Sequence, residues 1–289
     1  MLTFKAYAKV NLTLEVLGPR EDGYHDIVSV MQTIDMADTV KLEPADEISL
    51  ECDQPALQSS DNLALVAANA LRAVSGGRRG VRIALNKDIP VAAGFGGGSS
   101  DAAAVLKGVN ELWGLGMSLE ELMPVAARIG SDVPFFLHGG TAMALGRGDR
   151  IRPLPPADLR WMVVLMPPIA LDDKTASLYR ALDRSNYTPG ALTHKLEARI
   201  RGGGDVPPQF LYNAFDAVAF DAFPGLEQYW STFYSLGARE IHLAGSGPAM
   251  YAPVSRKEVG TAIHLMLQHR HGWDARLVST QQVSRDRRA

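Results

Sequence analysis

One stretch decides the fold of this chain: Pro90-Val91-Ala92-Ala93-Gly94-Phe95-Gly96-Gly97-Gly98-Ser99-Ser100-Asp101-Ala102-Ala103-Ala104-Val105-Leu106. Just upstream, Val81, Ile83 and Leu85 alternate with polar or small residues, which predicts a half-buried strand. Downstream, residues 102–113 are alanine-rich and carry apolar residues at helical spacing, which predicts a helix. Four glycines within residues 94–98 therefore lie between a strand and the start of a helix.

This arrangement is typical of a loop that binds phosphate. A helix N-terminus presents unpaired N–H groups and the positive end of the helix dipole, and both favour an anion. Glycines let the backbone approach a ligand closely, while Ser99 and Ser100 add hydroxyl groups, one of which is expected to cap the helix. A flexible connector is the alternative, but this loop contains no Lys or Glu and leads directly into a strong helix. We interpret it as a polyphosphate-binding loop.

Three common phosphate-binding loops are excluded by specific residues. A Walker A loop ends in Gly-Lys-Ser or Gly-Lys-Thr, and the stretch has no lysine. A dinucleotide fingerprint that begins at Gly94 would need a third glycine at the position of Ser99. A protein-kinase loop is accompanied by His-Arg-Asp and Asp-Phe-Gly, and neither tripeptide occurs in the chain.

Composition indicates an ordinary globular protein. Its 289 residues predict about two domains, and a net charge of -3 lacks the basic excess that nucleic-acid binding requires. The single cysteine, Cys52, excludes an internal disulfide and a cysteine-based metal cluster, and is expected to be a small buried hydrophobe. The N-terminus does not resemble a signal peptide, and the longest apolar run, residues 161–166, is too short to span a membrane. We therefore expect a soluble, cytoplasmic protein.

The N-terminal region carries polar residues whose role is not decided by spacing. Residues 3–17 alternate in polarity, which predicts a strand pair or one long bent strand. Spacing alone assigns Lys9 and Asn11 to a solvent-exposed face. After a turn-rich loop, Tyr24 and His25 stand at a strand start. They could bind a base, or they could simply close the loop.

Helix starts follow in the first half of the chain. Asp61 is expected to cap a helix that begins near residue 63, and Ser118 and Glu121 have the spacing of a capping box. Farther on, Ser131 or Asp132 could cap a short helix with proline in its first turn. A residue at such a junction is also exposed enough to meet a substrate, so both interpretations stay open.

A change of composition at Pro153-Leu154-Pro155-Pro156 predicts a domain boundary, with domains over residues 1–155 and 156–289. The second domain is predicted to contain strands at 161–166, 240–243, 250–253 and 274–278, and helices at 172–182, 189–201, 210–222, 226–236 and 256–269. This order predicts an open α+β sheet with helices on one face.

The motifs together resemble the GHMP kinase superfamily. The glycine stretch resembles its Pro-x-x-x-Gly-Leu-Gly-Gly-Gly-Ser-Ser loop, with Phe95 in place of leucine. Residues 130–136 resemble its Gly-Ala-Asp-Val-Pro-Phe segment, with Ser131 in place of alanine, and residues 244–249 resemble its third, glycine-turn motif. Lys9-Val10-Asn11-Leu12 and the run from Arg20 to His25 resemble the signature of the diphosphocytidyl-methylerythritol kinase branch.

This resemblance implies an α+β, two-domain GHMP kinase fold, with a ribosomal-protein-S5-like N-terminal domain and a ferredoxin-like C-terminal domain. It implies an ATP- and Mg²⁺-dependent kinase of the non-mevalonate isoprenoid pathway, acting on the 2-hydroxyl of 4-diphosphocytidyl-2-C-methyl-D-erythritol. The expected partner is that small cytidine-diphosphate-linked substrate, with no nucleic acid and no membrane. We expect a monomer or a weak homodimer.

The family's functional positions correspond to three groups of residues in this sequence. Expected ATP-binding residues are Pro90, Gly94, Gly96, Gly97, Gly98, Ser99, Ser100 and, beside the adenine, Asn62. Expected substrate-binding residues are Asn11, Tyr24, His25, Tyr179, Gly245, Ser246 and Gly247. The expected catalytic residues are Asp132 as general base and Lys9, which would neutralise developing charge and keep Asp132 ionised. The sequence does not identify the metal ligands.

Two other functions are compatible with parts of this sequence. A kinase for homoserine or mevalonate would share the glycine loop, but the run Gly23-Tyr24-His25 argues against it. A non-catalytic, ATP-binding regulatory protein would also keep the loop, but the presence of both Lys9 and Asp132 argues against that role.

Overall fold

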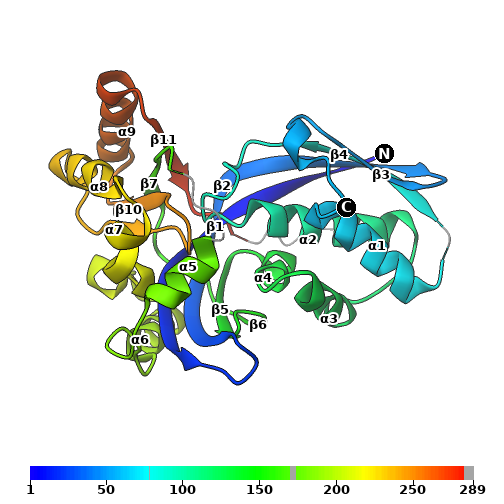
Figure 1. The fold of residues 1–289 in the computed structure, drawn as a ribbon, viewed down its shortest axis with the longest axis horizontal. Helices are drawn as coiled ribbons and strands as arrows, with labels where there is room; N and C mark the ends of the chain where they lie inside the picture. Colours follow the sequence, from blue (N-terminus) through cyan, green and yellow to red (C-terminus); the bar gives the residue numbers. More distant parts are fainter. Residues whose placement is uncertain (78, 170–173, 283–289) are drawn as a thin grey trace. The chain divides into compact units, whose positions relative to one another are not determined.

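The computed structural model describes residues 1–77, 79–169 and 174–282, which form two compact units (Figure 1). Unit 1 comprises residues 1–8, 36–91 and 96–138, and unit 2 comprises residues 9–35, 92–95 and the described part that follows residue 138. Two long strands, β1 (Leu2–Pro19) and β2 (His25–Ala45), contribute residues to both units. The boundaries of these two units do not fall at residue 155. The predicted boundary between two family domains at residue 155 stays a prediction.

Unit 1 contains strands of a seven-stranded sheet, including parts of β1 and β2, together with helices. Its elements after β2 are β3 (Ile48–Cys52), η1 (Pro55–Leu57), α1 (Leu63–Ser75), β4 (Gly80–Asn86), α2 (Gly97–Leu112), α3 (Leu119–Ile129) and α4 (Val133–His138). β4 pairs antiparallel with β2 and parallel with β3, and α1 and α2 lie together on one face of these strands (Figure 1). The predicted burial of Val81, Ile83 and Leu85 on one side of β4 is confirmed.

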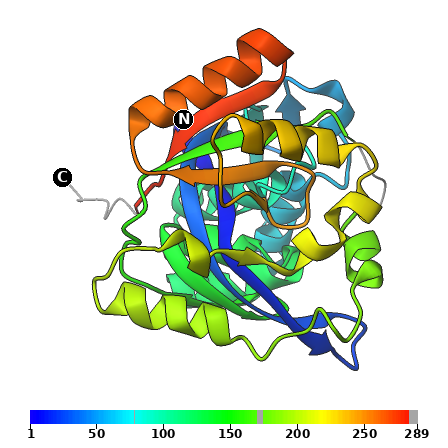
Figure 2. The ribbon, with the colours of Figure 1, turned by 90° about the vertical axis from the view of Figure 1, so that its left-hand side faces the viewer.

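Unit 2 contains a four-stranded antiparallel sheet in the order β11-β7-β10-β9. Its elements are β5 (Thr141–Gly146), β6 (Arg150–Pro153), β7 (Trp161–Met166), α5 (Lys174–Ala181), α6 (Ala191–Arg201), η2 (Pro208–Phe210), β8 (Tyr212–Asn213), η3 (Ala214–Val218), α7 (Ala219–Ala222), α8 (Leu226–Ser235), β9 (His242–Leu243), β10 (Met250–Val254), α9 (Lys257–His271) and β11 (Asp274–Ser279). This is the strand order of a ferredoxin-like sheet, and α9 packs along it (Figure 2).

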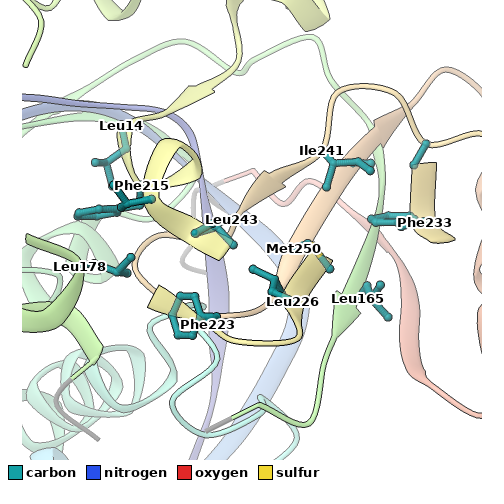
Figure 3. Close-up of a cluster of buried hydrophobic side chains, with 14 of the residues drawn as sticks. Leu14, Leu165, Leu178, Phe215, Phe223, Leu226, Phe233, Ile241, Leu243 and Met250 are labelled. Carbon is teal, nitrogen blue, oxygen red and sulfur yellow. The ribbon is translucent and has the colours of Figure 1, made fainter. Parts of the chain in front are cut away.

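The core of unit 2 is formed by apolar side chains between this sheet and the helices (Figure 3). Leu165 and Met250 come from the sheet, while Phe215 comes from η3, Phe233 from α8, and Phe223 directly follows α7. All five are fully or almost fully buried, and burying a side chain of this size contributes about 1.5–3 kcal/mol. The core therefore holds η3 and α8 firmly against the strands.

The structure corrects two predicted helix starts in unit 1. α2 begins at Gly97 instead of near Ala102, so both serines lie inside its first turn and its N-cap is Gly96, which has φ 74°. The N-cap of α1 is Asn62 and not Asp61, because the Asn62 side chain accepts a hydrogen bond from the N–H of Ala64. The capping box between Ser118 and Glu121 is confirmed, with both reciprocal hydrogen bonds present.

One predicted helix in unit 2 is wrong. Residues 210–222 are divided into the end of η2, the short strand β8, η3 and α7. β8 pairs in parallel with β1, and the Asn213 side chain accepts a hydrogen bond from the N–H of Phe215 at 3.0 Å. This local bond competes with a continuous helix. The predicted start of the helix at 172–182 lies outside the described residues.

Candidate active site

The glycine stretch forms the N-terminus of α2. The first turn of α2 consists of Gly97, Gly98, Ser99 and Ser100. The N–H of Ser100 donates to the carbonyl oxygen of Gly96. The N–H groups of the three residues before it have no carbonyl oxygen one turn earlier in the helix to bind. Ser99 is partly exposed, whereas the buried hydroxyl of Ser100 donates to the carbonyl oxygen of Tyr7 at 2.7 Å. The Ser100 hydroxyl thus fastens α2 to β1, and Ser99 is the serine available to a ligand.

Two further predicted segments of unit 1 lie beside this first turn. A methyl group added at Gly98 would lie 3.7 Å from Leu63, the first residue of α1. One added at Gly130 would lie 3.9 Å from the Ser99 hydroxyl. The start of α1 and the turn before α4 therefore both adjoin the proposed phosphate site.

Asn62 and Asp132 occupy these two neighbouring segments. The Asn62 side chain accepts from the N–H of Ala64 and donates to the carbonyl oxygen of Leu57, each at 2.9 Å, so its amide is already used to shape the start of α1. Asp132 is partly exposed and directly precedes α4. Its carbonyl oxygen accepts from the N–H of Phe135 at 3.1 Å, which holds its backbone in the turn.

In unit 2, Lys9 and Asn11 lie on β1 and are buried, with exposed fractions of 4% and 3%. The solvent-exposed face predicted from spacing is therefore wrong, because β1 is covered on both sides in this region. Lys9 Nζ donates to Asn11 Oδ1, and Asn11 Nδ2 donates to the Ser29 hydroxyl, both at 2.8 Å. The Tyr251 hydroxyl donates to the Asn11 carbonyl oxygen at 2.7 Å, which fixes this part of β1.

The glycine turn after β9 packs against two neighbours in unit 2. A methyl group at Gly245 would lie 2.7 Å from Lys9 Nζ, and one at Gly94 would lie 1.7 Å from the carbonyl oxygen of Ala244. One at Gly247 would lie 1.9 Å from the carbonyl oxygen of Ala93. Only glycine allows these close backbone approaches. The turn thus contacts both the Lys9 region and the beginning of the glycine stretch.

Ser246 connects the same turn to α5. Its hydroxyl lies 2.9 Å from the hydroxyl of Thr175, which is the second residue of that helix. Since α5 also carries Tyr179, this contact links the glycine turn to the helix that carries one of the predicted aromatic residues.

The aromatic residues of unit 2 form a cluster around His25. The His25 and Tyr179 rings are stacked, with centroids 4.7 Å apart and planes at 20°. Tyr179 also packs edge-on against Phe215 of the core at 4.9 Å, and the Tyr187 hydroxyl lies 3.5 Å from His25 Nε2. Burial lowers the pKa of His25, which keeps its imidazole neutral near pH 7. A neutral histidine can both donate and accept hydrogen bonds.

Tyr24 lies beside a residue that the sequence analysis did not single out. Tyr24 is 52% exposed, and the Arg147 guanidinium lies 4.8 Å from its ring centroid. Asp149 forms an ion pair with Arg147 at 2.9 Å. Arg147 and Tyr187 were missed because each lies in a loop far along the sequence, where no periodic pattern places it near the Tyr24–His25 pair.

The predicted residues are thus gathered into two groups, one in each unit. Unit 1 holds Gly96–Ser100, Pro90, Asn62 and Asp132, and unit 2 holds Gly94, Lys9, Asn11, Tyr24, His25, Tyr179 and the turn Gly245–Gly247. The pairing of Lys9 with Asp132 stays a prediction, because these residues belong to different units. Among the described residues, no group of three or more His, Cys, Asp and Glu side chains could hold a metal ion. No described helix is long and apolar enough to span a bilayer.

Known proteins share both sequence and fold with this chain. Residues 62–140 match the family model for the GHMP kinases N terminal domain. A 4-diphosphocytidyl-2-C-methyl-D-erythritol kinase from Dehalococcoides mccartyi is 42% identical over 97% of this chain and 98% of the relative. A relative of the same name from Symbiobacterium thermophilum is also 42% identical, over 90% of this chain and 93% of its own.

Solved structures agree with these relatives. A crystal structure of 4-(cytidine 5'-diphospho)-2C-methyl-D-erythritol kinase matches with a TM-score of 0.81 and 32% identity, and covers 96% of this chain and 99% of the other. A homoserine kinase from Cytophaga hutchinsonii matches with a TM-score of 0.71 over 97% of this chain and 95% of its own, but at 17% identity it shares the fold alone. The predicted α+β GHMP kinase fold is confirmed.

Proposed function

The chain belongs to the 4-diphosphocytidyl-2-C-methyl-D-erythritol kinase family of the GHMP kinases, and on that premise we propose how it acts. It transfers the γ-phosphoryl group of ATP to the 2-hydroxyl of 4-diphosphocytidyl-2-C-methyl-D-erythritol, a step in isoprenoid precursor synthesis. The observation that carries this proposal is the α2 N-terminus, where three glycines and Ser99 form a helix start suited to phosphate.

ATP is proposed to place its phosphates against this first turn of α2. The N–H groups of the turn and the Ser99 hydroxyl supply donors, and the helix dipole supplies a positive potential. Asn62 begins the neighbouring helix and is assigned to the adenine side. Phosphoryl transfer asks the protein mainly for positioning and charge stabilisation, which a preformed helix start provides.

Mg²⁺ is proposed to enter with the nucleotide. This ion keeps several water ligands and is usually held by substrate phosphates and only one or two protein oxygens. Among the described residues, no three or more His, Cys, Asp and Glu side chains form a metal-binding group, but the Ser99 hydroxyl is available as one protein oxygen. This fits a metal ion that is held mainly by the nucleotide. When bound, Mg²⁺ neutralises charge on the β- and γ-phosphates.

Asp132 is proposed as the general base that accepts the proton of the attacking hydroxyl. Its partly exposed position at the turn before α4, beside Ser99, supports this role. Lys9 is proposed to stabilise the negative charge that develops during transfer, because a buried ammonium group acts more strongly than an exposed one.

Cytidine is proposed to bind at the aromatic cluster of unit 2. Tyr24 offers an exposed ring for stacking, and His25, held by Tyr179, offers a neutral imidazole for hydrogen bonds to the base. Asn11 and the glycine turn 245–247 are assigned to the methylerythritol part of the substrate. A cytoplasmic location, the absence of nucleic-acid and membrane partners, and a monomeric or weakly dimeric state stay predictions.

A paired assay tests this function. ADP production is measured with ATP, Mg²⁺ and 4-diphosphocytidyl-2-C-methyl-D-erythritol, and in parallel with the cytidine-free methylerythritol phosphate, with homoserine and with mevalonate. We expect turnover only with the cytidylyl substrate. Turnover with homoserine or mevalonate instead would assign the chain to another GHMP activity, and ATP binding without any turnover would indicate a regulatory protein.

A further inference from the structure

A buried ion network lies next to the glycine stretch in unit 1. Lys87, just after β4, forms ion pairs with Asp38 of β2 and Asp101 of α2. All three side chains are at most 3% exposed. None of them belongs to the residues assigned above to ATP, to the substrate or to catalysis.

The network connects the two ends of the glycine stretch. On the upstream side, Asp38 Oδ1 accepts hydrogen bonds from the N–H groups of Asp88 and Ile89, at 2.6 and 2.9 Å. On the downstream side, Lys87 Nζ donates to Asp101, in the second turn of α2, at 2.5 Å. The chain on either side of residues 90–100 is therefore held by the same network, upstream through the backbone of Asp88 and Ile89 and downstream through the Asp101 side chain.

The network also adjoins the first turn of α2. A methyl group added at Gly97 would lie 3.1 Å from the Ile89 side chain and 3.5 Å from Asp38 Oδ2. Asp38 and Ile89 therefore lie beside Gly97, whose N–H is among the proposed phosphate donors. Lys87 itself is enclosed by carboxylates and does not need to reach the nucleotide.

Stability alone gives no good reason for this arrangement. Replacing a buried ion cluster by apolar side chains is often neutral or stabilising, whereas breaking one is strongly destabilising. Here the single ammonium group of Lys87 pairs with the carboxylates of both Asp38 and Asp101. Asp101 Oδ1 is buried with no hydrogen-bond partner in the described part of the chain. Departures from full polar satisfaction are expected at functional sites.

We propose that Lys87 is a positioning residue for nucleotide binding, and that it acts by tying Asp38 and Asp101 across the two ends of the glycine stretch. This inference rests on the proposed function, because it assumes that the stretch binds the phosphates of ATP. It predicts an effect on ATP and little effect on the cytidylyl substrate, whose proposed residues lie in unit 2.

The first variant is Lys87→Met, which removes the cation and keeps most of the side-chain length. We expect the Kd for ATP, measured by calorimetric titration, and the KM for ATP to rise about tenfold or more, which corresponds to about 1.4 kcal/mol. The KM for the cytidylyl substrate should stay within about twofold. Lys41→Met is the matched control, because Lys41 is exposed on β2 of the same unit, and it should change neither constant.

The double variant Lys87→Met, Asp101→Leu separates positioning from stability. It removes Asp101, one of the two carboxylates that the single variant leaves without a cation, while Asp38 keeps its hydrogen bonds from the N–H groups of Asp88 and Ile89. We therefore expect the midpoint of thermal unfolding to return toward that of the unsubstituted protein. The tether across the stretch is still absent, so the Kd for ATP should stay raised.

Each outcome decides the inference. A folded Lys87→Met protein with an unchanged Kd for ATP would overturn it, and so would a double variant that recovers both thermal stability and ATP affinity, since the network would then only stabilise the fold. An unsubstituted protein that does not bind ATP would overturn the proposed function together with this inference. If the unsubstituted protein binds ATP and both variants bind it with the same Kd, this inference alone would be overturned.

Discussion

The two units present their functional groups in different ways. In unit 1 the proposed nucleotide site is made mainly of backbone N–H groups at the start of α2. The buried ion pairs of Lys87 with Asp38 and Asp101 lie next to this helix start. In unit 2 the proposed substrate site is made mainly of side chains, such as Tyr24 and His25, supported by a hydrophobic core. If these sites are as proposed, phosphate recognition depends on where the backbone lies, and base recognition depends on which side chains are present.

This comparison implies different responses to mutation. Truncating an aromatic side chain in unit 2 removes a contact directly, so the KM for the substrate should report it. Around the glycine stretch, the backbone N–H groups cannot be removed by replacing a side chain, so most substitutions there should act by moving the backbone. The exceptions in unit 1 are Ser99, Asn62 and Asp132, because each is proposed to act through its own side chain.

The largest effect is expected for Asp132→Asn. An amide cannot accept the proton of the attacking hydroxyl, so kcat should fall by about 10²–10⁴-fold, a typical contribution of a general base. The KM for ATP should change little, because the phosphates are proposed to bind the backbone of α2. Steady-state kinetics of this variant are compared with those of Asp46→Asn, an exposed carboxylate of the same unit. Near-normal turnover of Asp132→Asn would remove Asp132 from catalysis.

The parts of the fold that follow local patterns could be predicted from the sequence. Three such patterns depend only on neighbouring residues, and the structure contains each of them: the alternation of apolar and polar residues in β4, the apolar run of β7 and the capping box at Ser118. The predicted helix at 210–222 failed because β8 pairs with β1, almost 200 residues earlier in the chain, and such pairing leaves no signal in a local window.

The candidate site was predictable to the extent that it consists of motifs. The glycine stretch and the Tyr24–His25 pair could be located by their residue order, whereas the burial of Lys9 could not, because it depends on how distant segments cover β1. In the sequence, Lys87 lies 49 positions after Asp38 and 14 positions before Asp101, with which it forms ion pairs. No spacing rule connects such residues, so this network became visible only in the structure.

Tyr24→Ala should have the next largest effect. Stacking of a base on an aromatic ring is worth about 1–3 kcal/mol, so the KM for the cytidylyl substrate should rise by about 5–150-fold. Tyr24→Phe keeps the ring and should retain most of the affinity. The measurement is the KM for the substrate at saturating ATP.

Tyr234→Ala is a closely matched control for Tyr24. Both tyrosines are 52% exposed, and each has an arginine over its ring, Arg147 at 4.8 Å for Tyr24 and Arg239 at 4.7 Å for Tyr234. Tyr234 lies on α8, where no substrate residue is assigned. If both alanine variants changed the KM equally, the effect would come from general surface changes and Tyr24 would not be part of the site.

The ion network of unit 1 predicts a dependence of stability on pH. Burial and the neighbouring Asp38 raise the pKa of Asp101 from 3.8 to about 7, against the opposing effect of Lys87. Between these values the folded protein binds a proton that the unfolded chain has released, so the free energy of unfolding falls as pH rises from about 4 to about 7. Asp101→Asn lacks this proton-binding step and should show a smaller fall.

Urea unfolding of the unsubstituted protein and of Asp101→Asn at several values between pH 5 and pH 8 measures this slope. Lys87 and Asp38 are the charged groups that face Asp101. The Lys87 ammonium stays protonated throughout this range because the two carboxylates outweigh the effect of burial and raise its pKa. Asp46→Asn should keep the slope of the unsubstituted protein. Equal slopes for all three proteins would show that Asp101 does not bind a proton in this range.

The smallest effects are expected at Asn62, where a capping role and a nucleotide contact can be told apart. Asn62→Ala removes the N-cap of α1 and should lower the free energy of unfolding by about 1 kcal/mol. Asn62→Asp keeps a good N-cap but loses the hydrogen bond that the amide donates to the Leu57 carbonyl oxygen, so it should retain only the capping part of the stability. If the amide also donates to the adenine, the KM for ATP should rise about fivefold in both variants, because one hydrogen bond is worth about 1 kcal/mol. A normal KM for ATP in Asn62→Asp would assign Asn62 to the helix start alone, and nucleotide recognition in unit 1 would then rest on the backbone of α2.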